Sequence, residues 1–127
     1  MEKKYLIDSD ILIDYLRGFP PSKDFLIDFK NKFFLFISVI NIIEIYSGKD
    51  LKSPHKKKLI DSFLNEFEII ELDEKIAKKA GEIRRRYQMP FADAIISASA
   101  IENSCTLVTR NVKHFSKVKE LKIFVPY

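Results

Sequence analysis

The chain has 127 residues, which fits a single domain spanning 1–127 and leaves little room for a second. Hydrophobic residues make up 46% of it, enough for a packed core, and no apolar run approaches the roughly 18 residues that a membrane helix needs. One cysteine excludes an internal disulfide, the N-terminus lacks a signal-peptide pattern, and the net charge of +4 suits a polyanionic partner without requiring one, so we expect a soluble protein of the cytoplasm.

Strand-like and helix-like segments alternate along the chain. A strand at 4–8 leads into a helix over 9–18, and Pro20 and Pro21 predict a turn before a helix over 22–32 that Ser22 would cap. The later segments, in chain order, are a strand at 33–38, a helix from Ser38 to Gly48, a helix at 53–66, a strand at 67–72, a helix at 73–87, a helix at 91–104, and strands at 106–109 and 122–125. This alternation favours an α/β fold with a parallel sheet, whose ligands bind beyond the carboxyl ends of the strands.

Three acidic residues stand in apolar surroundings in three of these segments. Asp8 follows the first strand, Glu44 is the one charge in SVINIIEIYSG, and Asp93 lies in the first turn of the helix that begins PFADAIISASA. A helix that is apolar on most sides is expected to be buried on most sides, which would place Glu44 in the interior. A buried lone carboxylate is costly unless it is paired, protonated or bound to a metal.

Each acid also has a purely structural explanation. Asp8 could cap the helix that follows it, Asp93 could interact with the dipole of its own helix, and Glu44 could reach solvent or a distant arginine. Together they favour a metal site, because three converging carboxylates repel one another unless a cation lies between them, and Mg²⁺ and Mn²⁺ prefer such oxygen ligands. A metal held in this way suits the hydrolysis of a phosphodiester.

Other catalytic motifs are missing from the sequence. It contains no G-x-S-x-G, Walker A, G-x-G-x-x-G or H-E-x-x-H pattern. His55 and His114 have no partners at ligand spacing, so we expect both at the surface.

Three stretches resemble, in the right order, the motifs of the PIN domain, most closely those of VapC-type toxins of prokaryotic toxin–antitoxin pairs: LIDSDILIDYLRG, ISVINIIEIYSG and PFADAIISASAIENSCTLVTRNVKHF. The resemblance implies a three-layer α/β/α fold with a central, mainly parallel sheet of about five strands. It implies a ribonuclease that depends on Mg²⁺ or Mn²⁺, with Asp8, Glu44 and Asp93 as metal ligands. It also implies a cognate antitoxin and a homodimer.

The resemblance assigns further positions around these acids. Asn111 takes the fourth acidic position, where many members carry Asp, and we expect it among the catalytic residues. Ser9 and Asp10 stand where Thr-Asn is common, and Thr109 matches a hydroxyl residue near the site, so all three are expected to support it. His114 stands where many toxins show a further Asp.

Basic and aromatic residues suggest contacts with partners. Arg84 and Arg110 are candidates for binding RNA phosphates, and Arg110 adjoins Asn111 at the predicted site. The basic runs at 84–86 and 55–58 could equally be solvated helix faces. Some of the Phe residues at 19–36 could face a partner protein, although half of them could belong to the core.

Two alternatives remain open from the sequence. One is a PIN-like module with weakened catalysis that acts by binding. The other is a phosphoacceptor domain of the receiver type with Asp73 as acceptor, which would leave Glu44 unexplained. Metal-dependent RNA cleavage would separate these possibilities.

Overall fold

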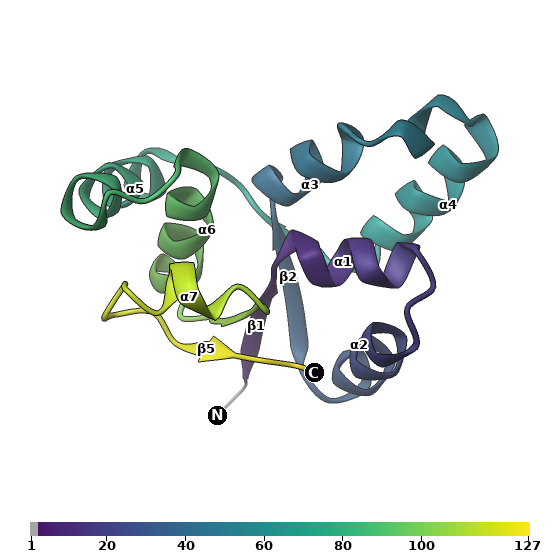
Figure 1. The fold of residues 1–127 in the computed structure, drawn as a ribbon, viewed down its shortest axis with the longest axis horizontal. Coiled ribbons are helices and arrows are strands. Elements are labelled where there is room, and N and C mark those ends of the chain that lie inside the picture. The colour runs from purple at the N-terminus through teal and green to yellow at the C-terminus, as the bar shows by residue number, and fades with distance from the viewer. Residues whose placement is uncertain (1–2) are drawn as a thin grey trace.

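The computed structural model describes residues 3–127 and has a five-stranded parallel sheet at its centre, in the order β3-β2-β1-β4-β5 (Figure 1). The strands are β1 (Lys4–Ile7), β2 (Phe34–Ser38), β3 (Glu68–Ile70), β4 (Thr106–Val108) and β5 (Ile123–Phe124). All five predicted strands are confirmed, and each is shorter at one or both ends than the sequence suggested. The order places β1 in the middle, with β2 and β4 as its neighbours.

Helices cover both faces of the sheet, which confirms the three-layer α/β/α fold (Figure 1). They are α1 (Ser9–Leu16), α2 (Pro20–Lys32), α3 (Val39–Tyr46), α4 (Pro54–Leu64), α5 (Glu74–Tyr87), α6 (Phe91–Glu102) and the short α7 (Val112–Phe115), together with a 3₁₀ turn, η1 (Lys49–Lys52). Leu6 packs in the core on the α5–α6 side, whereas the next residue, Ile7, packs in the core on the α1–α2 side. Side chains alternate along a strand, so a central strand covered on both faces is apolar throughout.

Three of the later helices follow residues whose side chains cap them. The side chains of Ser38, Ser53 and Asp73 accept hydrogen bonds from backbone N–H groups in the first turns of α3, α4 and α5. The prediction for α2 is wrong, because this helix begins at Pro20 rather than after Ser22. Proline fits the first turn of a helix, where its missing N–H costs nothing.

The aromatic residues at 19–36 are divided between core and surface. Phe25 and Phe29 pack with ring centroids 4.2 Å apart, and Phe29 meets Tyr5 at 5.0 Å. Phe19 and Phe34 remain 41% and 48% exposed. Most of this segment therefore builds the core beside β1, and Phe19 and Phe34 are its two exposed phenylalanine rings.

The short elements η1 and α7 were not predicted, because four residues are too few to show a helical period. None of the helices within residues 3–127 is both long and apolar enough to cross a membrane.

Candidate metal centre

Asp8 sits at the carboxyl edge of the sheet, where β1 and β4 end side by side. Its side chain is buried, Oδ1 accepts a hydrogen bond from the Ser9 N–H at 2.8 Å, and Oδ2 accepts one from the Thr109 hydroxyl at 2.8 Å. Thr109 is itself fully buried. Asp8 therefore caps α1, as one explanation of the sequence held, and also faces the predicted site with a carboxylate that its neighbours hold in place.

Burial and, to a smaller extent, the charges of Asp10 and Glu44 together raise the pKa of Asp8 to about 7, against the hydrogen bonds from Thr109 and Ser9. Burial likewise raises the pKa of Asp10. The negative charge at this edge is thus held at a cost in free energy, and a nearby divalent cation would reduce that cost.

Glu44 is exposed, so the expectation that it is buried is wrong. Helix α3 buries one face through Ile40 and Ile45 and leaves Ile43 59% exposed. An apolar sequence on all sides did not imply burial on all sides, because no other element of the described chain covers the outer face of α3. The Glu44 carboxylate nevertheless reaches the site, since the Ser9 hydroxyl donates to Glu44 Oε1 at 2.6 Å.

Asn41 was not predicted as a site residue, yet it contacts Ser9. It is fully buried on α3, its Nδ2 donates to Ser9 Oγ at 2.8 Å, and its Oδ1 accepts from the Ser38 N–H at 2.7 Å. The signal available in the sequence was a lone amide within the apolar run SVINIIEI, since a buried amide needs hydrogen-bond partners.

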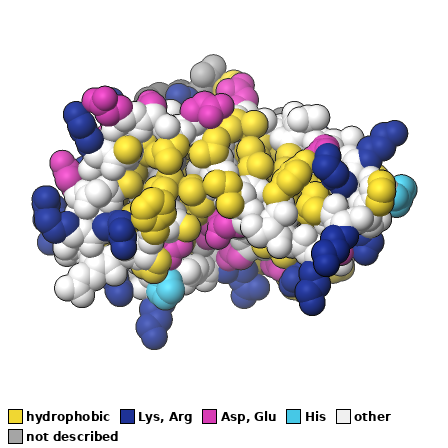
Figure 2. Space-filling view, turned by 90° about the horizontal axis from the view of Figure 1, so that it is seen from above, with side chains coloured by type: hydrophobic (Ala, Val, Ile, Leu, Met, Phe, Trp, Pro, Cys, Tyr) yellow, Lys and Arg dark blue, Asp and Glu magenta, His cyan; other side chains and the backbone are white. Residues whose placement is uncertain are grey.

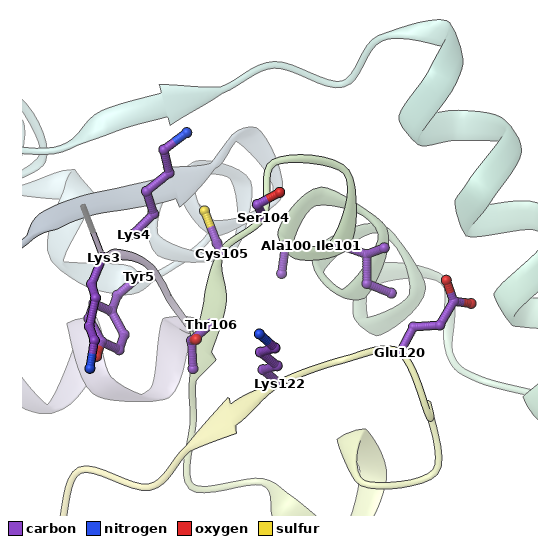
Figure 3. A pocket seen from close by; sticks show the side chains of 10 residues that line it. All are labelled: Lys3, Lys4, Tyr5, Ala100, Ile101, Ser104, Cys105, Thr106, Glu120 and Lys122. Atoms are coloured by element: carbon purple, nitrogen blue, oxygen red, sulfur yellow. The ribbon is translucent and has the colours of Figure 1, made fainter. Parts of the chain in front are cut away.

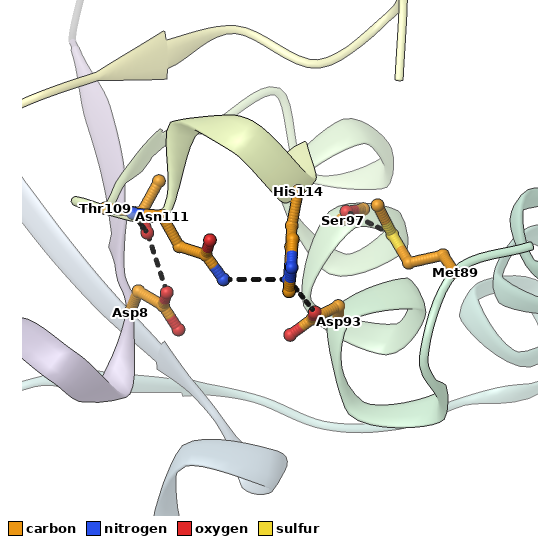
Figure 4. Close-up of polar contacts among 7 residues, drawn as sticks. All are labelled: Asp8, Met89, Asp93, Ser97, Thr109, Asn111 and His114. Carbon is orange, nitrogen blue, oxygen red and sulfur yellow. Dashed lines mark hydrogen bonds and ion pairs between the residues drawn. The ribbon is translucent and has the colours of Figure 1, made fainter. Parts of the chain in front are cut away.

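Asp93 approaches the site from the first turn of α6, opposite Asp8 (Figure 4). It is half-buried, and its Oδ2 lies 3.4 Å from Nδ1 of His114. The same Nδ1 lies 3.1 Å from Nδ2 of Asn111, whose backbone N–H donates to the Thr109 hydroxyl at 2.9 Å. His114 is exposed, as expected, but it also bridges Asn111 and Asp93. The side chain of Asn111 contacts His114 rather than an acid.

The remaining predicted residues surround this edge. Asp10 accepts hydrogen bonds from the backbone N–H groups of Ile11 at 2.8 Å and Arg110 at 3.2 Å, so it ties the start of α1 to the loop after β4. The Arg110 guanidinium is exposed and lies 5.0 Å from the ring centroid of Tyr127. Arg84, on α5, stands 5.4 Å from the exposed ring of Phe91 at the start of α6.

The face of the molecule at this edge combines acidic, apolar and basic side chains (Figure 2). Acidic side chains lie near its middle, a band of hydrophobic side chains crosses it, and lysine and arginine gather toward its ends. Within residues 3–127, no three His, Cys, Asp or Glu side chains are already drawn together closely enough to hold a metal ion. The donor set still suits Mg²⁺ or Mn²⁺, because it consists of carboxylate and amide oxygens and because a cation would offset the burial and the neighbouring charges that raise the pKa of Asp8.

Comparison with known proteins identifies the family. The PIN domain matches residues 5–121. The chain belongs to the PIN domain family. Ribonuclease VapC10 of Mycobacterium tuberculosis is 32% identical over 92% of this chain and 90% of its own length, and ribonuclease VapC1 of Methanocaldococcus jannaschii is 33% identical over 97% and 88%.

Solved structures share the fold over nearly the whole chain. A toxin–antitoxin complex from Klebsiella pneumoniae contains a chain with a TM-score of 0.82 and 30% identity, covering 97% of this chain and 98% of that one. VapBC2 from Rickettsia felis, bound to a DNA fragment from its promoter, gives a TM-score of 0.82 and 25% identity over 95% and 97%. The sequence-based assignment to PIN domains like VapC is confirmed.

Two other features of this PIN domain do not offer a competing site. Asp73, the acceptor in the receiver-type alternative, caps α5 through its carboxylate. A cavity of about 510 Å³ at the opposite, amino edge of the sheet is lined mainly by lysines and apolar residues (Figure 3). Its one acid, Glu120, pairs with Lys79 at 3.0 Å, and burial raises the pKa of its Cys105 thiol to about 11, so the cavity holds neither a metal cluster nor a reactive thiolate.

Proposed function

We propose that this PIN domain is a metal-dependent endoribonuclease and the toxin of a type II toxin–antitoxin pair in the cytoplasm. The proposal is supported by the placement of Asp8, Glu44 and Asp93 around the carboxyl edge of a PIN-type sheet. The three acids come from separate elements, and polar contacts through Ser9, Thr109, Asn111 and His114 link them. The relatives named ribonucleases match over about nine-tenths of their length, which supports the same reaction class.

In this proposal Asp8, Glu44 and Asp93 hold Mg²⁺ or Mn²⁺, with Asn111 as the fourth catalytic residue. A bound cation of this kind lowers the pKa of a water and neutralises charge on the scissile phosphate. Ser9 and Thr109 orient the carboxylates through the hydrogen bonds already described, and Asp10 fixes the loop that carries Arg110. Arg110 and Arg84 contribute positive charge for the phosphates of an RNA strand.

Cleavage of RNA by the purified chain tests this function. Activity should require Mg²⁺ or Mn²⁺ and stop with EDTA, and Asp93→Asn should lower the rate by about 100-fold or more while leaving the fold intact. Asp28→Asn is the matched control, since Asp28 lies on α2 in an exposed pair with Lys32. Cleavage that persists in EDTA would refute the metal mechanism. RNA binding without cleavage would favour the alternative of a PIN-like binding module.

The toxin role and its partners require a separate test. The neighbours in the solved structures include toxin–antitoxin complexes, and the exposed Ile43 (59%) and Phe91 (63%) offer apolar surface for the proposed homodimer. Expression of the wild type should arrest growth, whereas Glu44→Gln should not, and light scattering should give twice the monomer mass. Equal growth of both strains, with active enzyme confirmed, would argue against a toxin.

A further inference from the structure

The buried amide of Asn41 has a fixed orientation, and this orientation determines the direction of a chain of hydrogen bonds. The backbone N–H of Ser38 can only donate, so the atom of Asn41 that meets it at 2.7 Å is the oxygen. The nitrogen of the same amide therefore faces Ser9 Oγ, at 2.8 Å. An amide nitrogen is a donor only, so the Ser9 hydroxyl must act there as acceptor.

The Ser9 hydroxyl has a single proton, and the hydrogen bond from Asn41 determines where that proton points. Because the hydroxyl already accepts from Asn41, its proton is free to point at Glu44 Oε1, 2.6 Å away. The chain thus runs in one sense, from the Ser38 N–H through Asn41 and Ser9 to the Glu44 carboxylate. A hydroxyl without the Asn41 donor could rotate and donate elsewhere.

Glu44 depends on this bond for its position. Its side chain is exposed, and holding an exposed glutamate in one conformation costs side-chain conformational entropy. Within residues 3–127, the hydrogen bond from Ser9 is the one that reaches its carboxylate. Hydrogen bonds to ionised acceptors are short and strong, so this single bond is able to hold the carboxylate beside Asp8.

We propose that Asn41 is a positioning residue that acts through Ser9 to hold the Glu44 carboxylate in the metal-binding arrangement. The inference rests on the proposed function, because it concerns the same metal site. Groups that orient metal ligands without touching the metal commonly contribute 10–100-fold to metal affinity. A role limited to capping α3, through the Ser38 N–H, would stabilise the helix without changing metal affinity.

A double-mutant cycle on Asn41 and Ser9 separates these roles. Mn²⁺ binding is measured by calorimetry, and thermal unfolding is measured without metal, for Asn41→Ala, Ser9→Ala and the double variant. Each single substitution should weaken Mn²⁺ binding by about tenfold, and the double variant should bind no more weakly than Ser9→Ala alone. Ser9→Thr, which keeps a hydroxyl, should bind nearly as well as the wild type.

Ser38→Ala is the matched control, because the Ser38 side chain caps the same helix through the Ile40 N–H but does not contact Ser9. It should lower the melting temperature and leave Mn²⁺ affinity unchanged. If Asn41→Ala does not fold, Asn41→Ser takes its place, since serine keeps a polar group near the Ser38 N–H but has no atom at the position of Nδ2.

The outcomes are distinct. Unchanged Mn²⁺ affinity in the Asn41 variant, or independent losses that add in the double variant, would overturn the inference. Wild-type protein that binds no Mn²⁺ would instead remove the metal site on which it rests, and RNA cleavage in the presence of EDTA would show the same failure. Cleavage by Asn41→Ala should recover at Mn²⁺ concentrations about tenfold higher than the wild type needs.

Discussion

Replacing Asp8 with asparagine should make the metal-free protein more stable at pH 8, with a smaller effect at pH 5. Burial and the charges of Asp10 and Glu44 raise the pKa of Asp8 from 3.8 to about 7. A carboxyl group whose pKa is higher in the folded state favours folding fully below its unfolded pKa, near pH 4, and loses this contribution as the pH rises through about 7. The asparagine variant does not titrate, so it escapes this loss.

The size of the effect follows from the two pKa values. The difference between 3.8 and about 7 is worth about 4 kcal/mol in total, of which about 2.5 kcal/mol falls between pH 5 and pH 8. In the variant the one amide oxygen still accepts from the Ser9 N–H, whereas the amide nitrogen donates to the Thr109 hydroxyl, which must turn to accept. Two charge-assisted hydrogen bonds thus become weaker neutral ones, at a cost of about 1 kcal/mol each. The net gain at pH 8 is therefore about 2 kcal/mol, or roughly 6–10 °C in melting temperature for a chain of this length.

Urea unfolding of metal-free wild type and Asp8→Asn at several pH values from 5 to 8 tests the reasoning. The stability difference between them should grow by about 2.5 kcal/mol over this range, whereas Asp28→Asn, on the exposed face of α2, should show almost no change. Added Mg²⁺ should then stabilise the wild type more than Asp8→Asn. A stability difference that is constant with pH would show that Asp8 titrates near its ordinary pKa. It would refute the claim that burial and neighbouring acids make the charged form of Asp8 costly.

Substitutions at three further positions probe the edges of the site. Asn111→Asp should tighten Mn²⁺ binding in calorimetry, because a carboxylate attracts the cation more strongly than an amide, and Asn111→Ala should reduce cleavage less than Asp93→Asn does. An Asn111→Ala variant that equals the wild type in both assays would remove Asn111 from the site. Arg110→Gln and Arg84→Gln should each weaken RNA binding. Each should also reduce the slope of log binding constant against log salt concentration by about one, because one phosphate contact is lost. RNA titrations at increasing salt measure this slope, and an unchanged slope would show that the arginine does not contact RNA phosphates.

The sequence was sufficient for the fold because its local signals agree with one another. Each strand is a short, mainly apolar run, four of the helices follow a residue whose side chain caps them, and the β/α alternation allows little besides a parallel sheet. The start of α2 was missed because Pro20 and Pro21 are compatible with both a turn and a first helical turn.

The sequence indicated which acids lie near this edge of the sheet, but not the contacts that connect them. Asp8 and Asp93 follow from their places at a strand end and a helix start, whereas the burial of Glu44 was misjudged because apolar composition does not reveal which face of α3 another element covers. Asn41 joins the site by a hydrogen bond to Ser9, and His114 by its contact with Asp93. Both contacts connect segments that are far apart in the chain. Such contacts depend on tertiary packing, which no local pattern encodes.

The residues expected around the site depart from the family pattern in their charge. By the resemblance, this chain carries Asp10 where asparagine is common, whereas Asn111 and His114 stand where many members carry aspartate, so the site gains one acid and lacks two. The acid gained, Asp10, lies at the start of α1 and is the strongest of the neighbouring charges that raise the pKa of Asp8. Two backbone N–H groups, from Ile11 and Arg110, accommodate it there. An additional acid at position 111 would add negative charge to an edge where burial and the neighbouring acids already raise the pKa of Asp8. The tighter metal binding expected of Asn111→Asp should therefore be accompanied by lower stability of the metal-free protein.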